Sequence, residues 1–252
     1  MHTKLTELNK RIRIGVVSYL NTKPLLYGIS RSGLMDRVEL IEAYPANIAK
    51  MLLEDSIDMG LVPVAVIPQL KSPQIVSNYC IGANGEVASV AIFSEVPMEE
   101  ITTVLLDYQS RTSVNLAKIL LEKYWNKQVT FIETTEDFTN SIKGTVAGVV
   151  IGDRALEQRL QASYCYDLAE AWKKYSGLPF VFAAWVSNKN LGEDFEDAFN
   201  MANGYGLKHI AAVVAENPFS AYDLNKYYTE NISYNLDAEK RKGLELFLSL
   251  LK

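Results

Sequence analysis

An apolar stretch followed by a polar turn occupies residues 14–25, which read Ile14-Gly15-Val16-Val17-Ser18-Tyr19-Leu20-Asn21-Thr22-Lys23-Pro24-Leu25. The β-branched residues before position 18 predict a buried strand. Asn21 and Thr22 are good N-cap residues, and Pro24 suits the first turn of a helix, where its missing N–H does no harm. The stretch therefore predicts a strand, a polar turn and a helix.

The same alternation continues along the chain and favours an α/β architecture with mostly parallel sheets. Short, often β-branched stretches predict strands at 12–17, 39–43, 59–62, 88–93, 103–106, 129–132, 146–151 and 180–187. Helical patterns predict helices at 24–32, 45–54, 113–124, 154–160 and 168–175. After residue 190 the pattern is purely helical, at 195–215, 221–231 and 238–251.

Two short polar segments that follow predicted strands are candidate crossings between two lobes, at 94–97 and 187–190. With both as hinges, lobe one comprises residues 1–93 plus 188–252, lobe two comprises 94–187, and the ligand cleft lies between them. A hinge of two segments explains why the chain has no single linker rich in Pro, Gly or Ser.

The bulk composition is that of a globular protein and argues against two classes of partner. Of the 252 residues, 48% are hydrophobic and 22% are charged, and the formal net charge is −5. Nucleic-acid binding needs clustered Lys and Arg, so we expect none. No apolar run reaches the length of about 18 residues that a membrane span requires. The polar stretch 1–13 has no apolar signal segment, so we expect a cytoplasmic protein with no membrane partner.

Histidine and cysteine, the side chains that usually bind zinc, are scarce. Cys80 and Cys165 show no motif spacing, and His2 and His209 are the only histidines. We therefore expect no zinc or other metal site, no cofactor and no disulfide framework. Catalysis by a Ser-His or Cys-His pair would depend on His209, which lies inside a predicted helix.

Two polar turns are candidate binding segments. Ser18, Tyr19 and Asn21 follow the first strand, and ligands of open α/β sheets bind outside the carboxyl ends of strands. In the turn 107–113, Thr112 and Ser113 stand at a helix start that suits a carboxylate or phosphate. There, Arg111 could clamp a carboxylate with two hydrogen bonds. Each turn has an alternative interpretation as an ordinary cap, but two such turns in different lobes favour a cleft for an anion.

Two glycine-containing segments add further candidates. Asn84-Gly85 predicts a hairpin turn, which would place Ser89 near the floor of the hinge. Gly152 ends a strand and permits close backbone approach, and Asp153 either caps the next helix or faces the cleft.

Residues 14–25 closely resemble the opening motif of the chorismate dehydratase family of menaquinone biosynthesis. Further matching stretches follow in the same order at 58–64, 82–94, 110–113, 151–155 and 166–183. The first motif is specific and the others are supportive, and together they cover most of the chain to about residue 190. Ala88 departs from the family pattern, in which a longer polar side chain is familiar at this position.

The resemblance implies a two-lobed, type II periplasmic-binding-protein-like (Venus flytrap) fold with central mixed β-sheets. The implied activity is conversion of chorismate to 3-[(1-carboxyvinyl)oxy]benzoate and water, in the futalosine pathway. Asn21 is the implied residue beside the reacting ring, whereas Arg111 receives no role. Matching motif positions imply substrate contacts for Ser89, Thr112, Ser113, Gly152 and Asp153. A transient contact with the next pathway enzyme is a further expectation.

Three alternatives share this fold or part of it. One is a non-enzymatic binding protein for a small carboxylate, which the lack of an export signal disfavours. Another is the related dihydroxynaphthoate synthase, whose opening segment is rich in Cys, Pro, Asn and Asp. The third is a ligand-sensing domain of a transcription regulator, which would need a helix-turn-helix.

Overall fold

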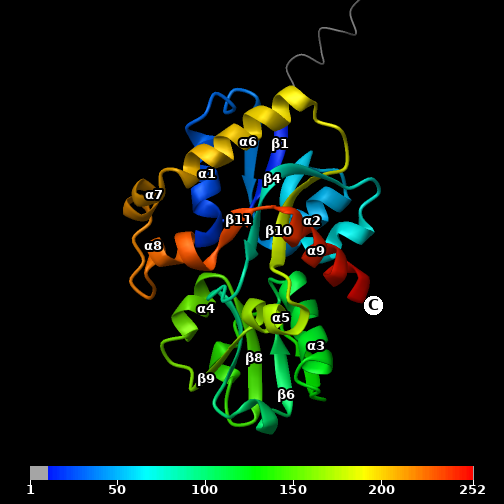
Figure 1. Cartoon of the computed structure of the whole chain (residues 1–252), viewed down its shortest axis with the longest axis vertical. Coiled ribbons are helices and arrows are strands. Elements are labelled where there is room, and N and C mark those ends of the chain that lie inside the picture. Colours follow the sequence, from blue (N-terminus) through cyan, green and yellow to red (C-terminus); the bar gives the residue numbers. More distant parts are fainter. Residues whose placement is uncertain (1–10, 252) are drawn as a thin grey trace, which may run out of the picture.

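A computed structural model describes residues 11–251 as two lobes, each built on a mixed β-sheet with helices packed around it (Figure 1). The strand order is β11-β4-β10-β3-β1-β2 in the first sheet and β7-β6-β8-β5-β9 in the second. The predicted two-lobed α/β fold is confirmed. His2 and most of the polar stretch 1–13 lie outside the described residues.

The first sheet contains a parallel nucleus in which β1 pairs with both β2 and β3. An antiparallel strand, β10, then joins β3 to β4, and β4 also pairs with β11. The bounds are β1 (Ile12–Val16), β2 (Val38–Glu42), β3 (Met59–Pro63), β4 (Gln74–Ala83), β10 (Phe180–Ser187) and β11 (Ser233–Asn235).

The second sheet repeats this plan. Its parallel nucleus is β7-β6-β8, and β5 enters antiparallel between β8 and β9. The bounds are β5 (Val90–Ser94), β6 (Thr103–Leu106), β7 (Thr130–Glu133), β8 (Val146–Ile151) and β9 (Tyr164–Asp167).

The helices divide between the lobes as the strands do. The first lobe carries α1 (Lys23–Ser30), α2 (Pro45–Leu53), α6 (Glu193–Leu207), α7 (Ile210–Glu216), α8 (Leu224–Lys226) and α9 (Ala238–Leu250). The second lobe carries α3 (Thr112–Lys123), α4 (Asp153–Gln158) and α5 (Leu168–Ser176). Within residues 11–251, every helix is too short or too polar to span a membrane.

The predicted lobe boundaries at 93/94 and 187/188 are wrong by one strand each. β5 belongs to the second sheet and β10 to the first, so the chain crosses between lobes at 84–89 and at 177–179. Each crossing strand enters the new lobe antiparallel beside the last parallel strand, β8 or β3. The Asn84-Gly85 segment is therefore an interlobe crossing and not a hairpin turn.

Other differences arise where pairing between distant segments decides the structure. The sheets are mixed and not mostly parallel, because the crossing strands β5 and β10 each make two antiparallel pairings. The C-terminal region is not purely helical, since β11 adds to the edge of β4. The helix predicted at 195–215 is divided into α6 and α7.

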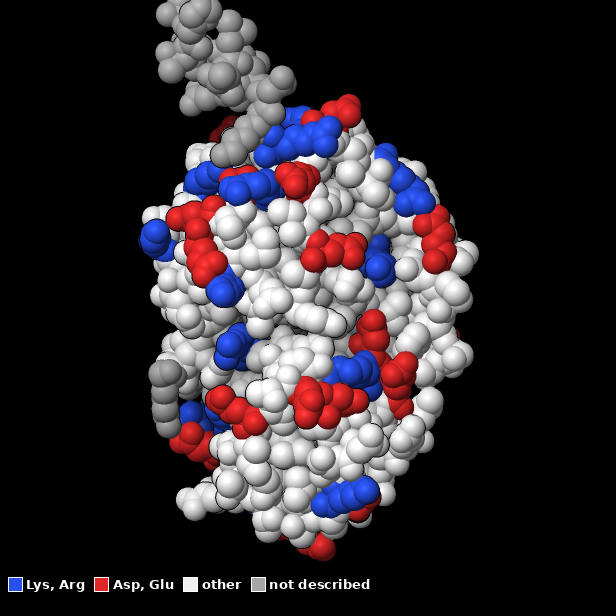
Figure 2. Space-filling view, turned by 180° about the vertical axis from the view of Figure 1, so that it is seen from behind, with Lys and Arg blue, Asp and Glu red and all other residues white. Residues whose placement is uncertain are grey.

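The charged surface is mixed where Figure 2 shows it. On that face, Lys and Arg side chains of the described residues are interspersed with Asp and Glu side chains over both lobes. This pattern is that of an ordinary solvated surface.

A buried carboxylate, Asp167, fixes the first crossing to the second lobe. It accepts the backbone N–H groups of Val87 (3.1 Å) and Ala88 (2.9 Å), and it also caps α5 by accepting those of Ala169 and Glu170 (both 3.1 Å). Asp167 is only 6% exposed, so no solvent replaces these bonds. One side chain thus anchors both the crossing and a helix.

Replacing this anchor is expected to destabilise the fold strongly. Asp167→Ala removes an N-cap, for about 1 kcal/mol, and leaves two buried N–H groups unpaired at about 1–3 kcal/mol each. We expect a loss of at least about 3 kcal/mol in denaturant unfolding. Asp223→Ala is the control, because Asp223 caps the exposed start of α8 and is not bonded to either interlobe crossing. Equal losses in the two variants would contradict the anchoring role.

Candidate functional site

A pocket lies between the lobes, and its walls are the carboxyl ends of strands from both sheets. It contains about 570 Å³ of space free of protein atoms, part of which is open to solvent. Residues that end β1 and β3 or directly follow them meet residues that end β8 or follow β6. In open α/β sheets, helix N-termini point toward the same edge as the carboxyl ends of the strands. This edge is therefore the usual place for a ligand.

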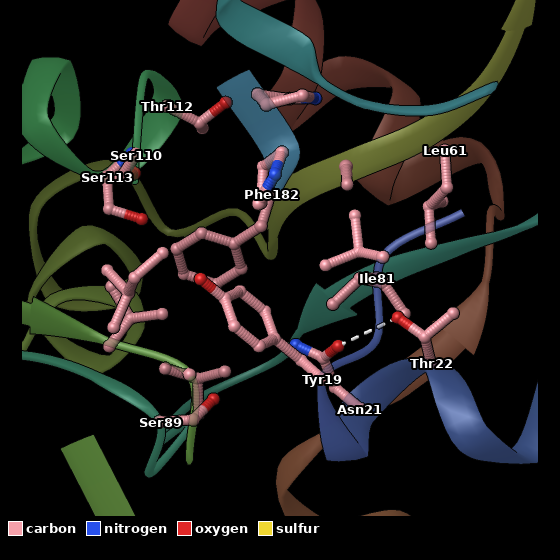
Figure 3. Close-up of a pocket in the computed structure, with 18 residues that line it drawn as sticks. Tyr19, Asn21, Thr22, Leu61, Ile81, Ser89, Ser110, Thr112, Ser113 and Phe182 are labelled. Atoms are coloured by element: carbon pink, nitrogen blue, oxygen red, sulfur yellow. Dashed lines mark hydrogen bonds between the residues drawn. The ribbon is translucent and has the colours of Figure 1, made fainter. Parts of the chain in front are cut away.

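The lining combines apolar walls with neutral polar groups. The apolar contributors are Val17, Pro45, Leu61, Pro63, Ile81, Val87, Val90, Ile151, Phe182 and Ala183. The polar side chains are those of Tyr19, Asn21, Thr22, Ser89, Ser110, Thr112 and Ser113. Among residues 11–251, none of the 18 lining residues carries a formal charge. In Figure 3, the three residues of the 110–113 turn face Asn21 and Thr22, with Tyr19 and Phe182 between.

The first turn holds Tyr19 and Asn21 in the cavity through contacts with distant parts of the chain. The Tyr19 hydroxyl donates to Gln109 Oε1 in the other lobe. Gly152, at φ 65°, faces the Tyr19 ring, whose atoms lie 3.3 Å from where a Cβ would stand. The Asn21 carbonyl accepts from Tyr234 (2.9 Å), and its amide oxygen accepts from Thr22 Oγ1 (3.1 Å). These two bonds occupy the oxygens of Asn21, and its side chain also hydrogen-bonds to Tyr227.

The second turn presents the start of α3 to the cavity. Thr112 and Ser113 are its first two residues and are buried, and Ser113 N–H donates to Ser110 Oγ (3.1 Å). Thr112 Oγ1 also accepts the backbone N–H of Ala65 from the first lobe (3.2 Å). The positive end of a twelve-residue helix and three hydroxyls therefore suit an anionic group.

An ion pair between a buried carboxylate and a partly exposed arginine supports this turn. Asp107 accepts from Arg154 Nη2 at 2.8 Å and from the backbone N–H groups of Gln109 (2.9 Å) and Ile151 (3.2 Å). Burial raises the pKa of Asp107, although Arg154 acts in the opposite direction. The pair fixes the position of Gln109, which in turn receives the Tyr19 hydroxyl.

Asp153 lies beside the cavity without lining it. Its Oδ1 accepts the backbone N–H of Leu20 across the lobes (3.1 Å). Burial raises the pKa of Asp153, and the bond from Leu20 only partly opposes that effect. The carboxylate therefore acts here as a contact between the lobes.

The described part of the chain contains no cluster of three or more His, Cys, Asp or Glu suited to a metal ion.

The structure brings six of the predicted site residues together in the cavity lining and leaves three outside it, Asp153 beside the cavity and Ser18 and Arg111 at the surface. The cavity lining includes Tyr19, Asn21, Ser89, Thr112, Ser113 and Gly152. Ser18 is exposed and outside the lining, because its neighbours Val17 and Tyr19 face the cavity and extended chain alternates. Arg111 is also exposed and outside it, since it precedes the first turn of α3. The predicted ligand contacts of Ser18 and Arg111 are thus not supported.

The residues that shape the site and were not predicted include Gln109, Phe182 and Tyr227. Gln109 lies within the polar turn 107–113, so its neighbours were the signal that could have found it. Phe182 lies in a strand that the pattern assigns only to the core. Tyr227, which donates to Ser89, comes from the C-terminal region, where the sequence shows only a helical pattern.

The sequence profile of a menaquinone biosynthesis family matches residues 12–252. The chain belongs to this family. The chorismate dehydratase of Thermus thermophilus is 24% identical over 94% of this chain and 94% of its own length. That of Campylobacter jejuni is 26% identical, over 94% and 96%.

Solved structures show the fold of this family member. Protein AF1704 of Archaeoglobus fulgidus superposes with a TM-score of 0.75 at 11% identity, covering 99% of this chain and 97% of its own. The Candida albicans CA3427 product, described as having the generic periplasmic binding protein fold, gives 0.61 at 11% identity, over 96% and 92%. The predicted periplasmic-binding-protein-like fold is confirmed.

The bond between Tyr19 and Gln109 is expected to hold the lobes together. Tyr19→Phe keeps the ring on Gly152 and removes one neutral hydrogen bond, worth about 0.5–1.5 kcal/mol. We expect amide hydrogen exchange in residues 107–113 to accelerate by about 2- to 12-fold. Tyr175→Phe, on α5 away from the cavity, is the control. Unchanged exchange in Tyr19→Phe would show that this bond does not hold the lobes closed.

Proposed function

We propose that this chain is a lyase that converts chorismate to 3-[(1-carboxyvinyl)oxy]benzoate and water, as an early step of menaquinone biosynthesis by the futalosine route. The observation that carries the proposal is the uncharged interlobe cavity, in which hydroxyls and the start of α3 face the Asn21 amide. Two relatives that match nearly the whole chain are chorismate dehydratases.

The chemistry requires positioning more than reactive groups. Chorismate loses the proton on C3 and the hydroxyl on C4, and the ring becomes aromatic, so the product is strongly favoured. The hydroxyls of Ser89, Thr112 and Ser113 hold the carboxylates, and Asn21 orients the departing water. Fixing a reactive geometry supplies as much as about 7–11 kcal/mol of the barrier.

The proton acceptor in this proposal is a carboxylate of the substrate itself. Within the described residues, the lining contains no carboxylate or imidazole that could act as a base. Asp153 is the nearest candidate in the predicted site, and its Oδ1 is engaged by Leu20 N–H. Closure excludes water and strengthens the hydrogen bonds that hold the dianion.

The direct test is to mix the purified protein with chorismate, without metal or added cofactor, and to follow products by chromatography and mass spectrometry. Loss of one water with formation of the enolpyruvyl benzoate supports the proposal. Unchanged chorismate in the presence of folded protein would overturn it and favour a binding protein for a small carboxylate.

Asn21 is expected to act on the reacting ring. Asn21→Ala should lower kcat by about 10²-fold, the effect of removing one well-placed donor, and change KM much less. Steady-state kinetics with chorismate measure both. The control is Asn140→Ala, an exposed residue of the second lobe outside the lining. An Asn21→Ala enzyme with full turnover would remove Asn21 from the mechanism.

Asp153→Asn separates a base from a structural contact. The amide oxygen still accepts from Leu20, so we expect kcat to stay within about threefold of wild type, whereas loss of a general base costs about 10²-fold or more. A fall of that size would mean that Asp153 takes the proton.

The same variant has a defined pH dependence of stability. Because burial raises the pKa of Asp153, the ionised carboxylate destabilises the fold above that raised pKa. The destabilisation disappears as the pH falls to the unfolded-state pKa of about 3.9. Asp153→Asn should therefore have the higher Tm at pH 7, and the difference should vanish near pH 4 in thermal melts. A difference that grows on acidification would contradict this sign.

A further inference from the structure

The C-terminal region contributes a buried tyrosine pair next to the cavity. Residues Tyr227–Asn231 form a π-helical turn directly after α8, a geometry that often occurs at functional sites. Tyr227 is 0% exposed and Tyr228 is 3% exposed. The hydroxyl of Tyr227 donates to Ser89 Oγ at 2.7 Å. Within the described residues, the buried hydroxyl of Tyr228 has no hydrogen-bond partner.

The bond from Tyr227 determines which way the Ser89 hydroxyl can point. Burial raises the pKa of Tyr227 far above its ordinary value, outweighing its hydrogen bonds to Ser89 and Asn21, so the phenol keeps its proton. That proton is the one donated to Ser89 Oγ. A serine hydroxyl has one proton and two acceptor sites. Once Ser89 Oγ accepts from Tyr227, its own proton remains available, and the side chain lines the cavity.

The backbone of Ser89 is fixed as firmly as its side chain. Its N–H donates to Val87 O (2.8 Å) across Ala88, and its carbonyl accepts Gly152 N–H (2.8 Å). Ala88 has φ 65°, a left-handed conformation that is unfavourable for a residue with a Cβ. This three-residue turn persists because Asp167 binds the N–H groups of Val87 and Ala88. Because the backbone of Ser89 is fixed, its side-chain hydroxyl is the part that can still rotate. The hydrogen bond from Tyr227 restricts this rotation.

We infer that Tyr227 is a positioning residue that directs the Ser89 O–H toward a carboxylate of the substrate in the cavity. The inference rests on the proposed function for the identity of the substrate, and on the hydrogen bond between two buried hydroxyls for the mechanism. Tyr227 acts through Ser89. It belongs to the first lobe, whereas Ser89 lies in the crossing that leads to the second lobe. It thereby couples the C-terminal region to substrate binding.

The test is a double-mutant cycle between Tyr227→Phe and Ser89→Ala, with kinetics on chorismate. Tyr227→Phe should raise KM about tenfold, the effect of weakening a hydrogen bond to a charged group, with a smaller change in kcat. In the Ser89→Ala background the same change should alter KM by less than about twofold, because no hydroxyl remains to be directed. Tyr228→Phe is the matched control and should keep wild-type kinetics.

Two outcomes overturn the inference. One is a Tyr227→Phe enzyme with wild-type KM, and the other is a pair of effects that add fully in the double variant. Thermal melts of all variants separate a loss of folding from a loss of positioning, since a purely structural role would change Tm and leave the coupling at zero.

A second readout keeps the inference separate from the proposed function. Calorimetry with benzoate, a simple aromatic carboxylate, measures the same cycle without turnover, and we expect the same pattern in affinity. Wild-type protein that leaves chorismate unchanged overturns the proposed function. The benzoate cycle then still decides for or against Tyr227: coupling with Ser89 supports the inference, and its absence overturns it.

Discussion

The Asp167 carboxylate is the constraint on which the arrangement of the two lobes depends. It binds the start of α5 and the first interlobe crossing at the same time, so the crossing cannot move without breaking a helix cap. The hydrogen bonds from Val87 and Ala88 N–H to Asp167 keep Ala88 in its left-handed conformation and thereby set the position of Ser89. The buried carboxylate of Asp167 thus sets the position of a neutral hydroxyl in the cavity lining. The general consequence is that the hinge segment is also part of the cavity wall.

The site separates charged groups that support the fold from neutral groups that face the ligand. Asp107 and Arg154 form their ion pair behind the 110–113 turn, and Asp153 contacts Leu20 backbone across the lobes. Each of these charged groups has a hydrogen-bonded partner within the protein. The cavity itself offers hydroxyls, one amide and a helix start. Such donors stabilise negative charge without bringing a fixed counter-charge into an apolar enclosure.

Local patterns predicted much of the fold, and failures occurred where distant segments decide. The strands at 103–106, 146–151 and 180–187 were predicted with their observed bounds, because β-branched runs end at polar turns. The crossings were misplaced because a strand carries no local mark of the sheet it joins. Both polar turns of the site were predicted from the sequence, because each joins the end of a strand to the start of a helix and ligands bind at such positions in open α/β sheets. Ser18 and Arg111 lie outside the cavity lining, because residue type does not give side-chain direction.

The unpredicted part of the site shows why sequence alone stops short of mechanism. Tyr227 and Ser89 are separated by 138 positions, and nothing in the helical pattern around Tyr227 distinguishes its hydroxyl from that of Tyr228. Only the fold makes one hydroxyl a donor to the cavity wall and leaves the other without a partner among the described residues. The fold is shared with binding proteins, so the orientation of individual donors is what makes an enzyme possible. A cavity with suitable donors can bind an anion in either class of protein, whereas an elimination reaction also requires each donor to point in a defined direction.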